Sequence, residues 1–170
     1  MNKGLVHIYT GDGKGKTTAA TGLATRCVGY GKTVCVFRFL KSSYSGELDS
    51  LEKLGVKIIQ INTSEKFYYD MSDAEKELTC KEIKSKLPYL FEIPFDMIIL
   101  DELICAVDLG IICIDEIIDI IKTKPLKTEL VLTGRNMPDK LLDCADYVSE
   151  IKCIKHPYAT GVDARCGIDF

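Results

Sequence analysis

Short runs of consecutive apolar residues alternate along this chain with longer stretches in which apolar residues recur every three or four positions. Continuous apolar runs are typical of strands that are buried on both faces, and the spaced pattern is typical of helices that bury one face. The runs predict strands at 5–9, 34–39, 56–61, 97–100 and 130–133, and a last extended segment at 147–154.

Helices are predicted between most of these strands. Ser72 and Glu75 have the spacing of a capping box, so a helix is expected to begin there. The other helical stretches are 17–28, 47–54, 114–121 and 138–145. The regular alternation predicts an α/β fold, a mostly parallel sheet with helices on both faces, in a single domain that spans residues 1–170.

Composition narrows the class of protein. With 170 residues, 46% of them hydrophobic, the chain is long enough for one well-buried domain and too short for two. A net charge of −3 offers no basic field for a nucleic acid, and no apolar run reaches the roughly 20 residues that span a bilayer. No signal peptide is visible, and the eight cysteines form no C-x-x-C pair. This pattern favours reduced, buried cysteines in a cytoplasmic protein over disulfides or a zinc site.

A glycine-rich loop with the ending Gly-Lys-Thr follows the first predicted strand and precedes a helix, which is the context of a phosphate-binding P-loop. Threonine stands where the usual motif has its first glycine. Backbone N–H groups and the helix N-terminus would form an anion cradle, Lys16 would reach the phosphates, and Thr17 would ligate a metal ion. A turn without a ligand is the alternative. The expected ATP- and phosphate-binding residues are Thr10, Gly11, Asp12, Gly13, Lys14, Gly15, Lys16, Thr17 and Thr18.

Two carboxylates follow the apolar strand at 97–100. Asp101 and Glu102 lie where parallel α/β sheets place their ligands, at the carboxyl ends of the strands. Mg²⁺ (or Mn²⁺) beside phosphates needs one or two carboxylates, so we expect either residue to meet the metal together with Thr17. A helix N-terminus with no other role is the alternative.

Three basic residues are further candidates. Arg135 follows another strand end and is expected to hold a phosphate oxygen as charge builds on a leaving group, although an ordinary turn would read the same way. Arg26, in the helix after the loop, and Lys41, after the strand at 34–39, are candidates for phosphate binding.

The segments "TGDGKGKTTAA", "GYGKTVCVFRFLK", "MIILDEL", "LVLTGRN" and "ADYVSEIKCIKHPYATGVDARCGIDF" resemble, in order and spacing, the P-loop type of ATP:corrinoid adenosyltransferase. The resemblance covers nearly the whole chain and implies a P-loop fold of the RecA-like kind. It implies that a Co(I) corrinoid attacks the 5′ carbon of ATP and that triphosphate leaves. Such a nucleophile carries no proton, so no general base is required, and Lys16 and Arg135 become the candidate catalytic residues.

The resemblance also implies a corrinoid contact. Family members use two aromatic side chains to displace the lower axial ligand of cobalt, and Phe67 and Tyr69 occupy the matching place, with Tyr instead of Trp. Packing within a loop is the alternative for these rings. A flavoprotein electron donor and a homodimer are further family expectations. Few residues precede the first strand, so we expect a more open corrin pocket or a cover made by the loops at 42–46 and 64–70.

Two other functions remain open from the sequence. A P-loop kinase for a small molecule would need a base near an acceptor hydroxyl, and no clear candidate is present. A non-catalytic ATP-binding module would bind ATP without turnover. The phosphate product distinguishes the three.

Overall fold

A computed structural model describes residues 3–40, 44–61, 64, 66 and 68–169. Its centre is a six-stranded sheet in which every neighbouring pair of strands is parallel. The prediction of a parallel α/β sheet is therefore confirmed. The strands are β1 (Val6–Thr10), β2 (Val34–Arg38), β3 (Lys57–Gln60), β4 (Met97–Asp101), β5 (Glu129–Thr133) and β6 (Tyr147–Glu150).

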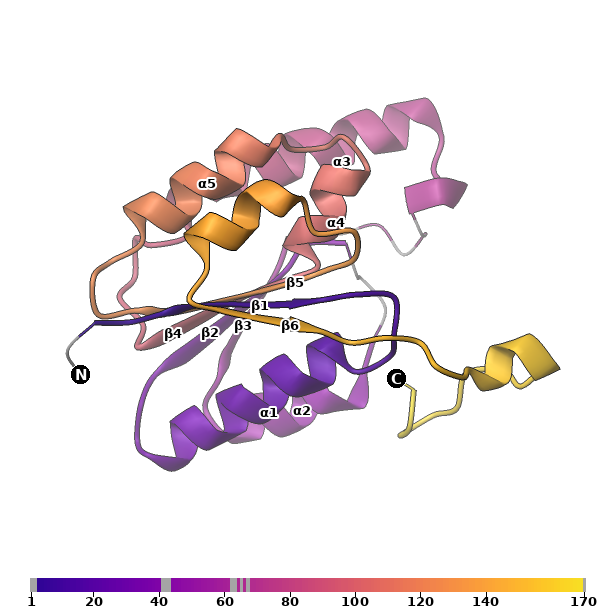
Figure 1. Cartoon of the computed structure of the whole chain (residues 1–170), viewed down its shortest axis with the longest axis horizontal. Helices are drawn as coiled ribbons and strands as arrows, with labels where there is room; N and C mark the ends of the chain where they lie inside the picture. Colours follow the sequence, from indigo (N-terminus) through magenta and orange to yellow (C-terminus); the bar gives the residue numbers. More distant parts are fainter. Residues whose placement is uncertain (1–2, 41–43, 62–63, 65, 67, 170) are drawn as a thin grey trace.

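Helices cover both faces of the sheet, as the continuous apolar strands require. Helices α1 and α2 lie on one face, and α3, α4 and α5 lie on the other (Figure 1). The α-helices are α1 (Lys16–Gly29), α2 (Gly46–Lys53), α3 (Asp73–Lys86), α4 (Leu103–Asp108) and α5 (Ile114–Thr123). The short 3₁₀ turns are η1 (Tyr68–Asp70), η2 (Leu87–Tyr89), η3 (Asp139–Cys144) and η4 (Pro157–Thr160).

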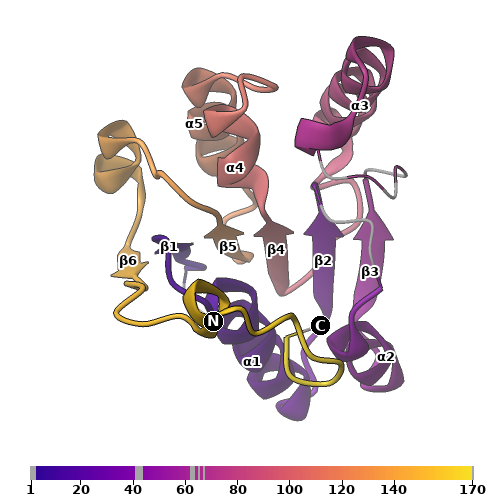
Figure 2. The same ribbon diagram turned by 90° about the vertical axis from the view of Figure 1, so that its right-hand side faces the viewer.

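The order of the strands determines which residues meet. It runs β3-β2-β4-β5-β1-β6, so β5 lies between β1 and β4, an arrangement of the RecA-like kind (Figure 2). Because parallel strands end at the same edge of a sheet, the residues that follow β1, β4 and β5 come together there. This edge holds Thr10, Asp101 and Thr133.

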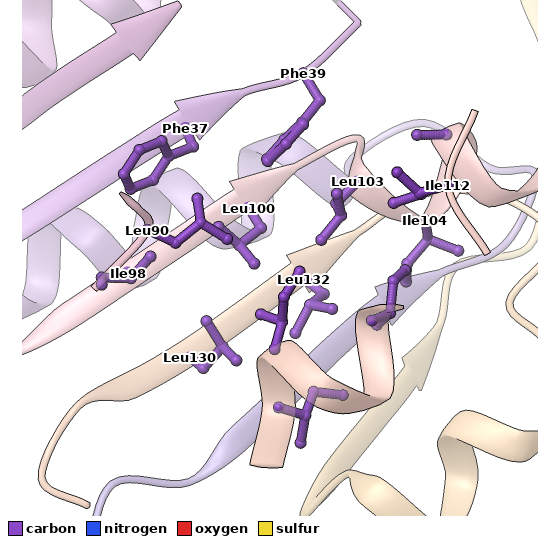
Figure 3. Packing of buried hydrophobic residues seen from close by; sticks show 14 of the residues in the cluster. Phe37, Phe39, Leu90, Ile98, Leu100, Leu103, Ile104, Ile112, Leu130 and Leu132 are labelled. Carbon is purple, nitrogen blue, oxygen red and sulfur yellow. The ribbon is translucent and has the colours of Figure 1, made fainter. Parts of the chain in front are cut away.

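Two apolar clusters hold the layers together. Buried side chains of β2, β4 and β5, among them Phe37, Leu100 and Leu132, form one cluster with Leu103 and Ile104 of α4 (Figure 3). On the other face Ala20 and Ala24 of α1 are fully buried against the sheet. Small residues at these two positions let the helix that follows the loop lie close to the strands.

Some expectations about local structure were wrong. Helix α4 was not predicted, because it has only six residues, too few to show a helical period. The expected helix at 138–145 is a 3₁₀ helix, and the last extended segment ends as a strand at Glu150. The cysteines were expected to be buried, but Cys113, Cys153 and Cys166 are exposed. Cys35 is the one that is fully buried among the described residues, and its burial raises its pKa to about 12. Within the described residues, no helix has the length and apolar character to cross a membrane.

Candidate functional site

The phosphate loop, defined as residues 10–18, leads from the end of β1 into the first turn of α1. The side chain of Lys16 folds back over it, and its Nζ donates hydrogen bonds to the carbonyls of Gly11 at 2.7 Å and Gly13 at 2.8 Å. Gly15 precedes the helix with a φ of 120°, a conformation that favours glycine. The start of α1 carries no acidic residue in its first turn, so the positive end of the helix is available to an anion.

The back of the loop is closed by the chain that follows β6. The backbone N–H of Gly13 donates to the carbonyl of Ile151 at 2.8 Å, and the N–H of Ile151 donates to the carbonyl of Thr10 at 2.8 Å. The carboxylate of Asp12 accepts a hydrogen bond from the N–H of Cys153 at 3.0 Å. This bond is the main reason that the pKa of Asp12 is lowered, and the charges of Lys16 and Arg135 add to it. Asp12 therefore ties the loop to the C-terminal segment.

The spacing of the sequence did not reveal these contacts. Ile151 and Cys153 lie about 140 residues from the loop, so no local pattern links them to it. The only local trace is the run of glycines. A Cβ on Gly11 would lie 2.4 Å from the carbonyl oxygen of Ile151, so this position needs glycine for close approach of two backbones.

Lys14, expected to bind phosphate, instead contacts the end of the chain. Its Nζ donates to the carbonyl of Ile168 at 2.9 Å and forms an ion pair with the carboxylate of Asp169. Arg165 donates to the same carboxylate from its backbone N and from Nε. The segment that ends the chain, drawn in yellow, lies beside the start of α1 in both views (Figures 1 and 2). The charge of Lys14 is thus already balanced by an anion.

Asp101 lies at the end of β4 and is almost fully buried, with 2% of its surface exposed. Its Oδ1 accepts two hydroxyl hydrogen bonds, from Thr17 at 3.0 Å and from Thr133 at 2.7 Å. Thr133 in turn accepts the backbone N–H of Glu102 at 2.9 Å. The structure therefore joins the loop, β4 and β5 through one carboxylate oxygen. Thr133 lies within the segment "LVLTGRN", and its spacing alone predicts no role for it.

These residues fit a magnesium ion. Mg²⁺ takes oxygen ligands, and the hydroxyl of Thr17 and the carboxylate of Asp101 already lie within hydrogen-bonding distance of each other. The described residues donate no hydrogen bond to the second oxygen of Asp101, although this side chain is buried. A buried carboxylate oxygen without a donor is a suitable cation ligand. Glu102 is less buried than Asp101. It lies just before α4 in the left-handed backbone conformation, with a φ of 63°, and its side chain is half-buried.

The basic residues do not all reach the loop. Arg135 is exposed just past β5, and its charge acts on Asp12 of the loop. Arg26 lies in the last turn of α1, ten residues after Lys16, which is about 15 Å along a helix axis. The structure therefore does not bring Arg26 to the loop, because the helix carries it away from there. Lys41 lies outside the described residues.

Of the two aromatic candidates, only Tyr69 belongs to the described residues, and Phe67 does not. Tyr69 is in η1 and 79% exposed, while its neighbour Tyr68 packs against the apolar cluster over the sheet. A large aromatic side chain this exposed contributes little to the packing of its own loop. Its ring is available to a ligand or partner.

One hollow on the described surface lies away from the loop. It has a volume of about 840 Å³ and lies between α3, α5 and η3, lined by residues such as Lys84, Ile112, Cys113 and Asp139. None of its lining residues belongs to the phosphate loop. The site at the strand ends is instead an open cradle of backbone amides, hydroxyls and charges, which suits a polyanion more than an apolar ligand.

Comparisons with known proteins agree with this geometry. The family described as ATP:corrinoid adenosyltransferase BtuR/CobO/CobP matches residues 2–170 of the chain. The corrinoid adenosyltransferase of Escherichia coli (strain K12) is 36% identical over 171 residues, which cover 99% of this chain and 86% of that protein. Two further corrinoid adenosyltransferases, from Salmonella typhimurium and a Sinorhizobium species, are 36% and 34% identical, over 99% of this chain and 86% and 81% of theirs.

Proposed function

Because this chain belongs to the ATP:corrinoid adenosyltransferase family, it adenosylates a corrinoid at the expense of ATP, and we propose that residues 10–18 hold the triphosphate during the transfer. The observation that supports this most directly is the position of Lys16. Its Nζ lies over the loop and donates to the carbonyls of Gly11 and Gly13. A triphosphate bound in the cradle would therefore find the ammonium group of Lys16 already beside it.

The bond that breaks lies between the 5′ carbon of ATP and its α-phosphate oxygen. The cobalt nucleophile, Co(I), supplies both electrons of the new cobalt–carbon bond, and the departing triphosphate keeps the electron pair of the broken bond. No proton changes place, so the chain needs no general base. What its residues supply is charge for the leaving group: Lys16 directly, the loop amides and the N-terminus of α1 through their dipoles, and Arg135 from the end of β5.

A magnesium ion would be held by the hydroxyl of Thr17 and the carboxylate of Asp101, with Glu102 as the second carboxylate nearby. Its chemistry is to neutralise the phosphate oxygens and to orient them. Thr10, Asp12, Gly15 and Thr18 complete the proposed cradle, together with Lys14. A phosphate role for Lys14 requires that its ammonium exchange the Asp169 carboxylate for a phosphate oxygen.

Tyr69, together with Phe67, is proposed to contact the corrinoid and to displace the lower ligand of its cobalt. The exposed ring of Tyr69 supports this, since such a ring can lie against a large, flat macrocycle without a change in the core. We further propose a reduced flavoprotein as the electron donor, a homodimer as the assembly, the cytoplasm as the location, and residues 1–170 as one domain.

The phosphate product tests the proposal. Protein, MgATP and chemically reduced cobalamin should yield a cobalt–carbon product, seen by its absorption spectrum, together with inorganic triphosphate in equal amount. Omission of the corrinoid should leave ATP intact. ADP and inorganic phosphate in place of triphosphate would indicate a kinase or an ATPase, and binding without any product would indicate a non-catalytic module.

A further inference from the structure

Thr133 is the most buried polar side chain of the site that the proposed reaction does not use. Only 1% of its surface is exposed, and it is the last residue of β5, the strand between β1 and β4. Its Oγ1 takes part in two hydrogen bonds, one donated to Asp101 Oδ1 at 2.7 Å and one accepted from the backbone N–H of Glu102 at 2.9 Å. One hydroxyl therefore contacts both residues that were expected to meet a metal.

The two donors to Asp101 Oδ1 are not equivalent. Thr17 belongs to the phosphate loop, and its hydroxyl would turn to the cation when the cation binds. Thr133 lies outside the loop, its one O–H is donated to Asp101, and its oxygen accepts the N–H of Glu102. When Thr17 turns away, Thr133 is the donor that keeps the buried carboxylate of Asp101 in its orientation.

The contact with Glu102 has a second consequence. Glu102 has a φ of 63°, a conformation that is uncommon for a residue with a side chain. Its N–H, at the turn between β4 and α4, donates to the hydroxyl of Thr133. The hydroxyl of Thr133 therefore also stabilises the turn that places the second carboxylate beside the first.

We propose that Thr133 is a positioning residue for the divalent cation of this site, acting through Asp101 and Glu102 without contacting the metal. The inference rests on the proposed metal role of Thr17 and Asp101. It predicts that loss of the hydroxyl weakens metal binding by about 10- to 100-fold, the range typical of groups that orient a metal ligand.

The test measures binding of Mn²⁺ to the protein with ATP and without corrinoid, so that no turnover takes place. The free Mn²⁺ signal in electron paramagnetic resonance, compared with that of the same ATP solution without protein, gives the affinity. Thr133→Ser should bind like the wild type, and Thr133→Ala, which lacks only the hydroxyl by comparison, should bind about 10- to 100-fold more weakly. Equal affinities of the Ser and Ala variants would overturn the proposal.

Thr128 provides a matched control. It is also buried, with 4% exposed, and its Oγ1 donates one hydrogen bond to the carbonyl of Phe95 at 2.9 Å, just before β5 begins. Thr128→Ala should lower the melting temperature and leave the Mn²⁺ affinity unchanged. An equal loss of affinity in Thr128→Ala and Thr133→Ala would contradict a specific role for Thr133. If the wild type binds no Mn²⁺ with ATP while it still adenosylates cobalamin, the metal site and this inference both fail and the proposed reaction stands.

Discussion

The backbone N–H of Gly13 donates a hydrogen bond of 2.8 Å to the carbonyl of Ile151, which joins the middle of the phosphate loop to the chain just after β6. The two backbones are so close that a Cβ on Gly13 would lie 2.7 Å from that carbonyl oxygen. The conformation of the loop therefore depends on a segment at the other end of the sequence. This relationship leads to the first of four predictions.

Gly13→Ala should displace the loop from the segment behind it. The obstructing atoms belong to the backbone of Ile151 and Lys152 and cannot turn aside. We expect a loss of about 1–3 kcal/mol in the free energy of unfolding, as for other overpacked sites. Turnover should fall by about 100-fold, since a displacement of about 1 Å in a site has effects of this size. Gly22→Ala, in the open middle of α1, should instead stabilise the protein by about 0.5–1 kcal/mol and keep its activity. Urea unfolding measures the stability of both variants, and an activity assay measures their turnover.

The two lysines of the loop should contribute unequally. Lys16→Ala removes charge from the departing triphosphate, and we expect kcat to fall by about 100- to 1,000-fold, or roughly 3 kcal/mol. Lys14→Ala should cost less than about ten-fold, because the Lys14 ammonium already pairs with Asp169 at the surface. The turnover of each variant with pre-reduced cobalamin measures these two losses. Equal losses would show that Lys14 leaves Asp169 for the phosphates.

Tyr69→Ala should lower the activity mainly when the reaction starts from Co(II). If the ring displaces the lower ligand of Co(II), activity should fall strongly with Co(II) and a protein reductant and little with Co(I). Tyr30→Ala is a suitable control, since Tyr30 is 83% exposed and lies at the far end of α1. Equal losses of Tyr69→Ala in both assays would contradict the proposed role.

The capping box of α3 predicts a dependence of stability on pH. Hydrogen bonds from Lys66 and Ser72 lower the pKa of Glu75 from its ordinary 4.5 to about 2. Because the pKa is lower in the folded state, the stabilisation is complete above pH 4.5 and is lost as the pH falls toward 2. Glu75→Gln should therefore lower the free energy of unfolding at pH 7, and its difference from the wild type should shrink below pH 4.5.

Glu77→Gln is the control for this effect. Glu77 lies in the same helix and forms an exposed pair with Lys81, so its replacement should change stability less than Glu75→Gln does. Urea unfolding at pH 7 and pH 3 compares the three proteins. A difference between Glu75→Gln and the wild type that does not change between these two values would contradict the assignment.

Local patterns in the sequence determined the strands, most of the helices, the phosphate loop and the carboxylate pair after β4. Apolar periodicity and glycine spacing act over a few residues, so they can be read without knowledge of the fold. The family resemblance came from the same short motifs. The pattern did not predict α4, because a helix of six residues is too short to show a helical period.

Only the tertiary structure decided which residues meet at the edge of the sheet. The order of the strands brings Thr133 between the phosphate loop and Asp101, and it brings Ile151 and Cys153 against the loop from about 140 residues away. The tertiary structure also turns Lys14 toward Asp169. These relationships depend on strand order and helix direction, which are set by the burial of whole faces and leave no mark on the spacing of neighbouring residues.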